Sequence, residues 1–158
     1  MTDTKTFDAL SVKKKANGML SIDVYQEMYF AAQKVIENST LLEIGTAHGA
    51  STISLALGAN SKNKIVSIDK ITGGSRDKYG SVDENKKIIE NNFKYFGVEK
   101  KIDFYVGTSS EIALLLDEKM KFSMLLIDAD GAIDRDFELF YNKLFPGSSI
   151  IIDDYFDN

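Results

Sequence analysis

The sequence contains no cysteine, only one histidine and only one proline among 158 residues. Without cysteine the chain can form no disulfide, no zinc–thiolate site and no cysteine nucleophile, and a single histidine excludes a histidine-rich metal site. Proteins of a reducing compartment often lack disulfides. We therefore expect a cytoplasmic location.

Basic patches and long apolar runs are also missing. The net charge is −5, and the longest basic run is the three lysines at 13–15. Binding to nucleic acid or to an anionic membrane requires clustered Lys and Arg, and a membrane span or signal peptide requires a longer apolar segment. We therefore expect no nucleic-acid partner and no membrane partner.

The length fits one domain covering residues 1–158, in which apolar patterns of strand and helix alternate. The patterns predict strands at 40–45, 64–69, 101–107, 122–128 and 148–154, and helices at 22–38, 51–58, 81–96 and 134–144. Ser21 is a candidate N-cap, and the pairs Ser81–Glu84 and Thr108–Glu111 match the capping box. This alternation predicts an α/β fold, an open parallel sheet with helices on both faces.

Acidic residues gather where the predicted strands end. In open α/β sheets, ligands bind beyond the carboxyl ends of the strands. A rim of carboxylates there would serve a cationic group, a ribose or a metal, although aspartates also favour turns and helix starts for local reasons. The acidic residues at these strand ends are Glu43, Asp69, Asp128, Asp130, Asp153 and Asp154.

The loop after the first strand is tight but departs from the dinucleotide-binding pattern. That pattern, G-x-G-x-x-G, would require glycine at 45, 47 and 50, where the sequence has Gly45, Ala47 and Ala50. The loop therefore fits a nucleoside without phosphates better than a dinucleotide, which disfavours an NAD-dependent oxidoreductase. Asp69 can accept both ribose hydroxyls. His48 is either a base or a loop residue without a proton role.

The stretch "LLEIGTAHGASTISLA" (41–56) resembles the first motif of class I S-adenosylmethionine-dependent methyltransferases. "IVSIDK", "FYVGTSSEI" and "LLIDADGAIDRDFELFYNKLFPGSSIIIDDY" are similar to the later motifs, and the resemblance runs from about Gly18 to Tyr155. The most similar branch is that of the small O-methyltransferases, either the caffeoyl-CoA and catechol type or a related branch with Asp-Asp-Tyr. The resemblance implies a Rossmann-like sheet with strand order 3-2-1-4-5.

The resemblance also implies a cofactor, S-adenosylmethionine, and a small-molecule acceptor that is methylated on oxygen. Asp128 would sit beside the methionine end and the acceptor as the catalytic residue. In the metal-dependent branch Asp128, Asp153 and Asp154 would hold Mg²⁺ or another divalent cation. The implied cofactor residues are Glu43 for the methionine amino group, Gly45, Thr46, Ala47 and Gly49 in the loop, Ser51 near the carboxylate, Asp69 for the ribose, Ser109 and Ser110 beside the adenine, and Asp128.

The sequence departs from the family pattern in three ways. No lysine lies near Asp128, so the catalytic base is unassigned, and the fifth strand ends in Asp153-Asp154 rather than Asp-Asn. The antiparallel strand pair that closes the family's sheet is missing, which leaves the fifth strand as an apolar edge. We expect either pairing of this edge with a second copy or a truncated gene product. A non-catalytic cofactor-binding or assembly module is therefore the alternative to an enzyme.

Overall fold

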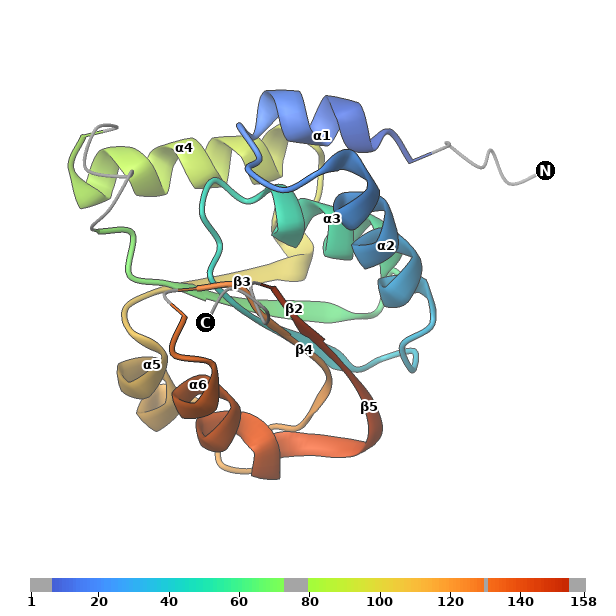
Figure 1. Cartoon of the computed structure of the whole chain (residues 1–158), viewed down its shortest axis with the longest axis vertical. Helices are drawn as coiled ribbons and strands as arrows, with labels where there is room; N and C mark the ends of the chain where they lie inside the picture. The colour runs from blue at the N-terminus through green and yellow to red at the C-terminus, as the bar shows by residue number, and fades with distance from the viewer. Residues whose placement is uncertain (1–6, 73–79, 130, 154–158) are drawn as a thin grey trace.

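The chain forms a five-stranded parallel sheet between two layers of helices (Figure 1). The computed structural model describes residues 7–72, 80–129 and 131–153. The strand order is β3-β2-β1-β4-β5, so the predicted α/β fold and its strand order are confirmed. The strands are β1 (Thr40–Ile44), β2 (Lys64–Asp69), β3 (Ile102–Val106), β4 (Phe122–Ile127) and β5 (Leu144–Ile152).

The helices divide between the two faces of the sheet. One layer contains α1 (Ala9–Lys15), α2 (Ile22–Gln33), α3 (Ala50–Gly58) and α4 (Val82–Tyr95), and the other contains α5 (Ser109–Leu115) and α6 (Ile133–Phe140) (Figure 1). Short 3-10 turns at Glu99–Lys101 and Tyr141–Lys143 lead into β3 and β5. The right-handed connection of parallel strands requires such crossovers, which place helices on both faces.

Local capping signals fixed where the helices begin. Ser21 accepts the Val24 N–H at the start of α2, and both predicted capping boxes are formed, at α4 and at α5. Each box satisfies backbone N–H groups that a helix start leaves without partners. These three predictions are confirmed because a cap depends only on residues within one turn.

Three predicted elements have other bounds in the structure, and one helix was not predicted. Helix α6 ends at Phe140 rather than at 144, because the chain passes through a 3-10 turn into β5. Helix α2 ends at Gln33 rather than at 38, and Asn38 has a positive φ of 61° that turns the chain toward β1. Strand β5 begins at Leu144 and runs through Pro146, which an edge strand tolerates because its outward N–H need not be paired. Helix α1 was not predicted. It is capped by Asp8, and three lysines in its last turn interact favourably with the helix dipole.

The core lies in two layers on either side of the central strands. Neighbouring residues of β1 face opposite ways, so Leu41 packs in the cluster beneath α1–α4 and Leu42 in the cluster above α5 and α6. All six residues of β4 are buried, as expected for a strand covered on both faces. The two clusters together hold β1 and β4 at the centre of the sheet, where the candidate site is built.

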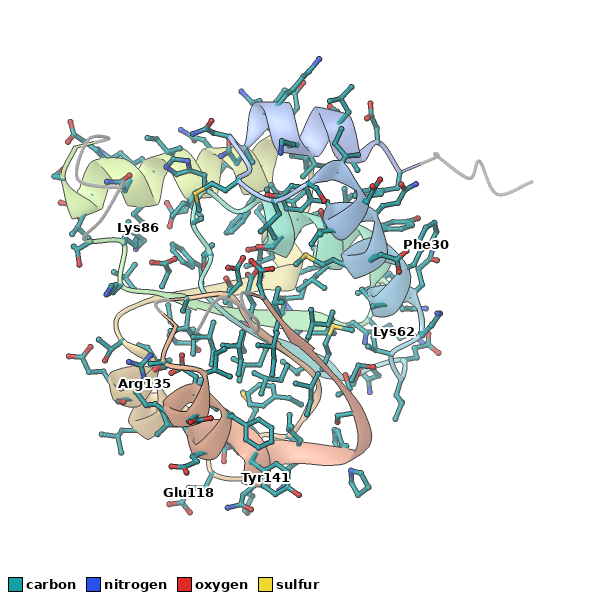
Figure 2. The ribbon with its side chains drawn as sticks, viewed as in Figure 1. Phe30, Lys62, Lys86, Glu118, Arg135 and Tyr141 are labelled. Carbon is teal, nitrogen blue, oxygen red and sulfur yellow. The ribbon has the colours of Figure 1, made fainter. Side chains whose placement is uncertain are left out.

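Exposed apolar side chains lie mainly at the edge and on the outer helices. Phe145 and Ile150 on the edge strand β5 are exposed, and the ring of Phe30 points outward from α2 (Figure 2). Pairing of β5 with a second copy stays a prediction. Over residues 7–72, 80–129 and 131–153, no helix combines the length and the apolar character that crossing a membrane requires.

Candidate functional site

The site is built where β1 meets β4, at the carboxyl ends of both strands. Gly45 follows β1 with a φ of 98°, and its N–H donates to the carbonyl of Ile68 at 2.8 Å. A Cβ at this position would lie 1.7 Å from the carbonyl oxygen of Asp128. No other residue fits here, because both the backbone conformation and the contact exclude a side chain. The first loop therefore touches the end of β4 directly.

Glu43 lies beneath this loop and is 0 % exposed. Its carboxylate accepts hydrogen bonds from the hydroxyls of Ser51 at 2.5 Å, Thr52 at 2.5 Å and Ser67 at 2.6 Å. Burial raises the pKa of Glu43 from 4.5 to about 7, although the three hydroxyl bonds oppose the shift. Glu43 therefore joins β1, α3 and β2. Its contact with a methionine amino group stays a prediction.

Asp69, at the end of β2, holds the same loop from the other side. Its Oδ2 accepts the backbone N–H of Thr46 at 2.8 Å and of Ala47 at 2.9 Å, and its Oδ1 accepts the N–H of Ile71 at 2.7 Å. These bonds fix the loop in the conformation that gives Ala47 a positive φ of 47°. The predicted bonds of Asp69 to ribose hydroxyls would add to this positioning role.

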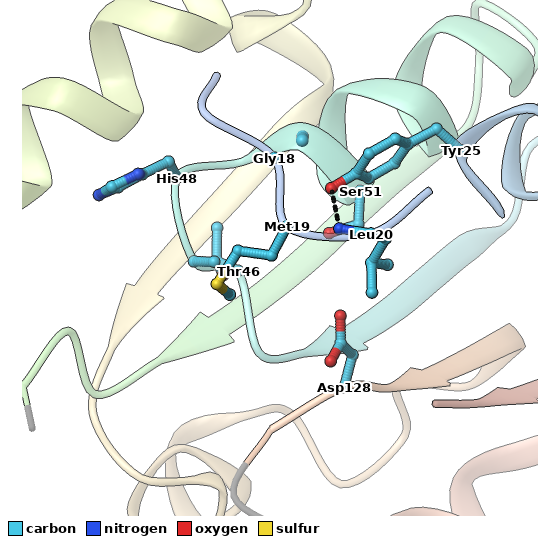
Figure 3. A pocket seen from close by; sticks show the side chains of 10 residues that line it. Gly18, Met19, Leu20, Tyr25, Thr46, His48, Ser51 and Asp128 are labelled. Carbon is cyan, nitrogen blue, oxygen red and sulfur yellow. Dashed lines mark hydrogen bonds between the residues drawn. The ribbon is translucent and has the colours of Figure 1, made fainter. Parts of the chain in front are cut away.

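A pocket opens between this loop, the end of β4 and the segment that joins α1 to α2 (Figure 3). Four of the predicted residues line it: Thr46, Ala47, Ser51 and Asp128. Gly45 and Gly49 belong to the same loop, whereas Glu43 and Asp69 hold the loop without lining the pocket. The remaining lining residues are Gly18, Met19, Leu20, Tyr25, His48 and Ala50.

Tyr25 is a pocket residue that the sequence did not reveal, since its helical spacing indicates only a core position. The side chain is 2 % exposed, and its hydroxyl accepts the Leu20 N–H at 3.1 Å (Figure 3). Burial raises the pKa of Tyr25, the backbone N–H of Leu20 opposes the shift, and the charges of Asp128 and Glu43 add to it. The hydroxyl therefore stays protonated at neutral pH and can donate.

Ser109 and Ser110 follow β3 at the start of α5. The hydroxyl of Ser109 is buried and donates at 2.5 Å to Asp136 on α6, which is fully buried and also receives two guanidinium N–H groups of Arg135. Ser110 is exposed. Ser109 thus joins α5 to α6, and the predicted contact of both serines with an adenine is untested.

His48 lies in the loop and is buried. Its carbonyl accepts a hydrogen bond from the Asn92 side chain of α4 at 2.9 Å, and its ring points away from Asp128 (Figure 3). This orientation favours the loop role over that of a base acting beside Asp128.

The predicted metal ligands are placed only in part. Asp153 follows β5 next to the end of β4, with its N–H donating to the Ile127 carbonyl at 3.0 Å, so Asp128 and Asp153 end neighbouring strands. Asp154 lies outside the described residues. Among the residues that the structure describes, no group of three His, Cys, Asp or Glu side chains could hold a metal ion. The described residues therefore do not by themselves make a metal site.

Solved structures with the same fold include several methyltransferases. The O-methyltransferase TomG from Streptomyces achromogenes, in complex with SAM, is 20% identical with a TM-score of 0.71 over 96% of this chain and 67% of that chain. An O-methyltransferase from Bacillus cereus in complex with SAH is 22% identical, with a TM-score of 0.71 over 96% and 69%. The SAH-bound methyltransferase PaMTH1 from Podospora anserina is 19% identical, with a TM-score of 0.72 over 93% and 62%.

These likenesses establish the fold, and the chain spans about two thirds of the length of those proteins. No curated protein sequence matches the chain. The family model described as "Methyltransferase domain" matches residues 42–155, which is more than half of the chain and includes the end of β1 with its loop and the end of β4. The chain therefore belongs to the methyltransferase domain family.

Proposed function

We propose that the protein transfers the methyl group of S-adenosylmethionine to an oxygen of a small molecule. Membership of the methyltransferase domain family supports the reaction class. TomG and the Bacillus cereus enzyme, whose fold this chain shares, are O-methyltransferases with SAM and SAH bound. The choice of a small molecule as acceptor rests on the sequence resemblance.

One observation carries the choice of cofactor: the hydrogen bonds from the first loop to Asp69. In a dinucleotide-binding fold the glycine-rich loop and the following helix start face a pyrophosphate. Here the N–H groups of Thr46 and Ala47 donate to a carboxylate, and a second carboxylate, Asp128, lines the pocket. A negatively charged pyrophosphate would be repelled, whereas the ammonium and sulfonium groups of S-adenosylmethionine would be attracted.

In the transfer, the oxygen of an acceptor hydroxyl would form a bond to the methyl carbon while the carbon–sulfur bond breaks and the sulfur becomes a neutral thioether. The hydroxyl proton would pass to water, since no base is assigned. S-Adenosylmethionine supplies the activated methyl group, so the chain contributes mainly alignment and exclusion of water. The tight contact between Gly45 and Asp128 fixes the loop relative to the end of β4. Asp128, which lines the pocket, would orient the acceptor and attract the positive charge.

A divalent cation would require a third ligand in addition to Asp128 and Asp153. Mg²⁺ prefers such oxygen ligands and would lower the pKa of an acceptor hydroxyl. Because the described residues supply no complete group, we assign no step to a metal.

Calorimetric titration with S-adenosylhomocysteine tests the proposal. Parallel titrations use NAD, and S-adenosylhomocysteine in the presence of Mg²⁺. We expect micromolar binding of S-adenosylhomocysteine and no heat from NAD. Asp128→Asn should bind at least about tenfold more weakly, in line with the loss of a charged contact. Asp103→Asn, an exposed carboxylate on the far strand β3, is the matched control and should bind like the wild type.

Binding of NAD, or of no nucleoside, would contradict the proposal. Methyl transfer from labelled S-adenosylmethionine to a panel of phenols, catechols and sugars then separates an enzyme from a binding module. Tight cofactor binding without transfer to any acceptor would favour the module.

A further inference from the structure

A strap of three residues, Gly18–Leu20, joins α1 to α2 and forms one wall of the pocket (Figure 3). Its start is fixed by the end of α1. Asn17 adopts a positive φ of 48°, and the N–H of Gly18 donates to the carbonyl of Lys13 at 2.8 Å, as in a Schellman motif. The strap therefore leaves α1 in a defined direction, across the pocket.

Two side chains hold the far end of the strap. The N–H of Leu20 donates to the Tyr25 hydroxyl at 3.1 Å, and the carbonyl of Leu20 accepts a hydrogen bond from the Lys13 ammonium. The two partners come from different helices, Tyr25 from α2 and Lys13 from α1. Both backbone groups of one residue are thus bound by side chains rather than by a strand or helix.

The strap lies in close contact with what it covers. A Cβ on Gly18 would lie 2.4 Å from the Tyr25 hydroxyl oxygen and 3.0 Å from the Cβ of Ala50 at the start of α3. Glycine is therefore what lets the backbone rest against both helices.

Met19 stands at the middle of the strap and is 69 % exposed, although it lines the pocket. Its side chain extends across the opening toward Thr46 (Figure 3). The flexible apolar side chain of Met19 therefore lies over the pocket, while hydrogen bonds hold Gly18 and Leu20 on either side of it.

We propose that the strap is a latched lid over the pocket, and that Tyr25 and Lys13 are positioning residues that keep it closed. A ligand can enter or leave by this side only when the two bonds of Leu20 break. A neutral hydrogen bond contributes a net factor of roughly two to ten to such an equilibrium, so loss of the Tyr25 bond should shift opening by about that amount. The bond from the charged Lys13 ammonium should contribute at least as much. The identity of the ligand rests on the proposed function, whereas the latch itself does not.

Amide hydrogen exchange followed by NMR tests the latch without any ligand. In Tyr25→Phe we expect the Leu20 amide to exchange roughly three- to tenfold faster, while the amides of β1 and β4 keep their wild-type rates. Tyr29→Phe is the matched control, because Tyr29 lies on the same helix with its ring stacked on Phe7 at 4.3 Å, outside the pocket lining. Equal Leu20 exchange in the two variants would overturn the proposal.

Lys13→Met tests the second bond and remains informative if Tyr25→Phe folds poorly, because Lys13 on α1 is only half-buried. Its control is Lys14→Met on the next, exposed position. We expect faster Leu20 exchange only for the Lys13 variant, and unchanged exchange would again contradict the latch.

Stopped-flow release of S-adenosylhomocysteine tests the role as a lid. We expect dissociation to be roughly three- to tenfold faster from Tyr25→Phe than from Tyr29→Phe. Faster Leu20 exchange with equal dissociation rates would overturn the lid while leaving the proposed function in place. Failure of the wild-type protein to bind would instead overturn the proposed function, and Leu20 exchange would still decide the latch.

Discussion

Carboxylates lie at the ends of four strands of the sheet, but those of β1 and β2 have different surroundings from those of β4 and β5. At the ends of β1 and β2, Glu43 and Asp69 are buried and receive hydrogen bonds from hydroxyls and backbone N–H groups of the protein. At the ends of β4 and β5, Asp128 and Asp153 are only partly buried, and Asp128 lines the pocket.

The difference separates the carboxylates that hold the first loop from a carboxylate that lines the pocket. A buried carboxylate is stable only if its acceptor positions are filled, and filling them fixes the groups that donate. Glu43 and Asp69 therefore make the loop rigid, whereas Asp128 lines the pocket. Gly45 joins the two sides, because it lies between Asp69's loop and the backbone of Asp128.

Gly45→Ala should have the largest effect, since it forces the two sides apart. The added Cβ would overlap the Asp128 carbonyl oxygen and would require an unfavourable φ, which together cost about 3 kcal/mol or more in free energy of unfolding. Urea denaturation measures it. Gly97→Ala is the matched control. Its φ is also positive, at 68°, but no atom lies within 4 Å of the added Cβ, so only about 1 kcal/mol should be lost. Equal losses in the two variants would show that the contact with the Asp128 carbonyl oxygen adds nothing to the cost of the positive φ.

Glu43→Gln should change the pH dependence of stability. Because the pKa of Glu43 is raised to about 7, the folded state binds this proton more tightly than the unfolded chain does. Stability therefore falls as pH rises from about 4.5 to about 7, by roughly 3 kcal/mol at most. Thermal or urea unfolding at pH 5 and pH 8 should show this loss in the wild type and a smaller loss in the variant. Parallel curves for the two proteins would contradict the assignment.

Asp69→Asn and Asp128→Asn should separate the two sides directly. Replacing Asp69 places an amide NH₂ against backbone N–H groups, which should lower the free energy of unfolding by about 2 kcal/mol. Replacing Asp128, which lines the open pocket, should lower it by less than about 1 kcal/mol while weakening cofactor binding. Denaturation and calorimetry on both variants provide the comparison. A larger stability loss for Asp128→Asn would reverse the roles proposed for the two sides.

Ala47→Gly should have the smallest effect and raise stability. Ala47 has a φ of 47°, which costs about 1 kcal/mol for alanine and nothing for glycine, although glycine also gains freedom in the unfolded chain. We expect a net gain of up to about 1 kcal/mol in urea denaturation. Ala59→Gly, at a φ of −66°, should instead lose stability and serves as the control. A loss at Ala47 would mean that its methyl group makes a contact worth more than the strain.

Local signals in the sequence determined the elements of this protein. Strand periodicity and two capping boxes predicted the alternation of strands and helices, and they could do so because each depends on residues within a few positions of one another. The acidic strand ends, Gly45 and the motif resemblance likewise led to the edge of the sheet where the pocket lies. Helix α1 was missed because its seven residues, three of them lysines, carry too short an apolar pattern to be distinguished from a loop.

The roles of particular side chains were decided by tertiary structure. The sequence placed Glu43, Asp69 and Asp128 at equivalent strand ends and gave no means of telling which would be buried by hydroxyls, bound by backbone N–H groups or left facing the pocket. Tyr25 looked like any core residue of a helix until the Leu20 N–H was seen to reach its hydroxyl. Burial and hydrogen-bond partners depend on residues far apart along the chain, and only folding brings those residues together.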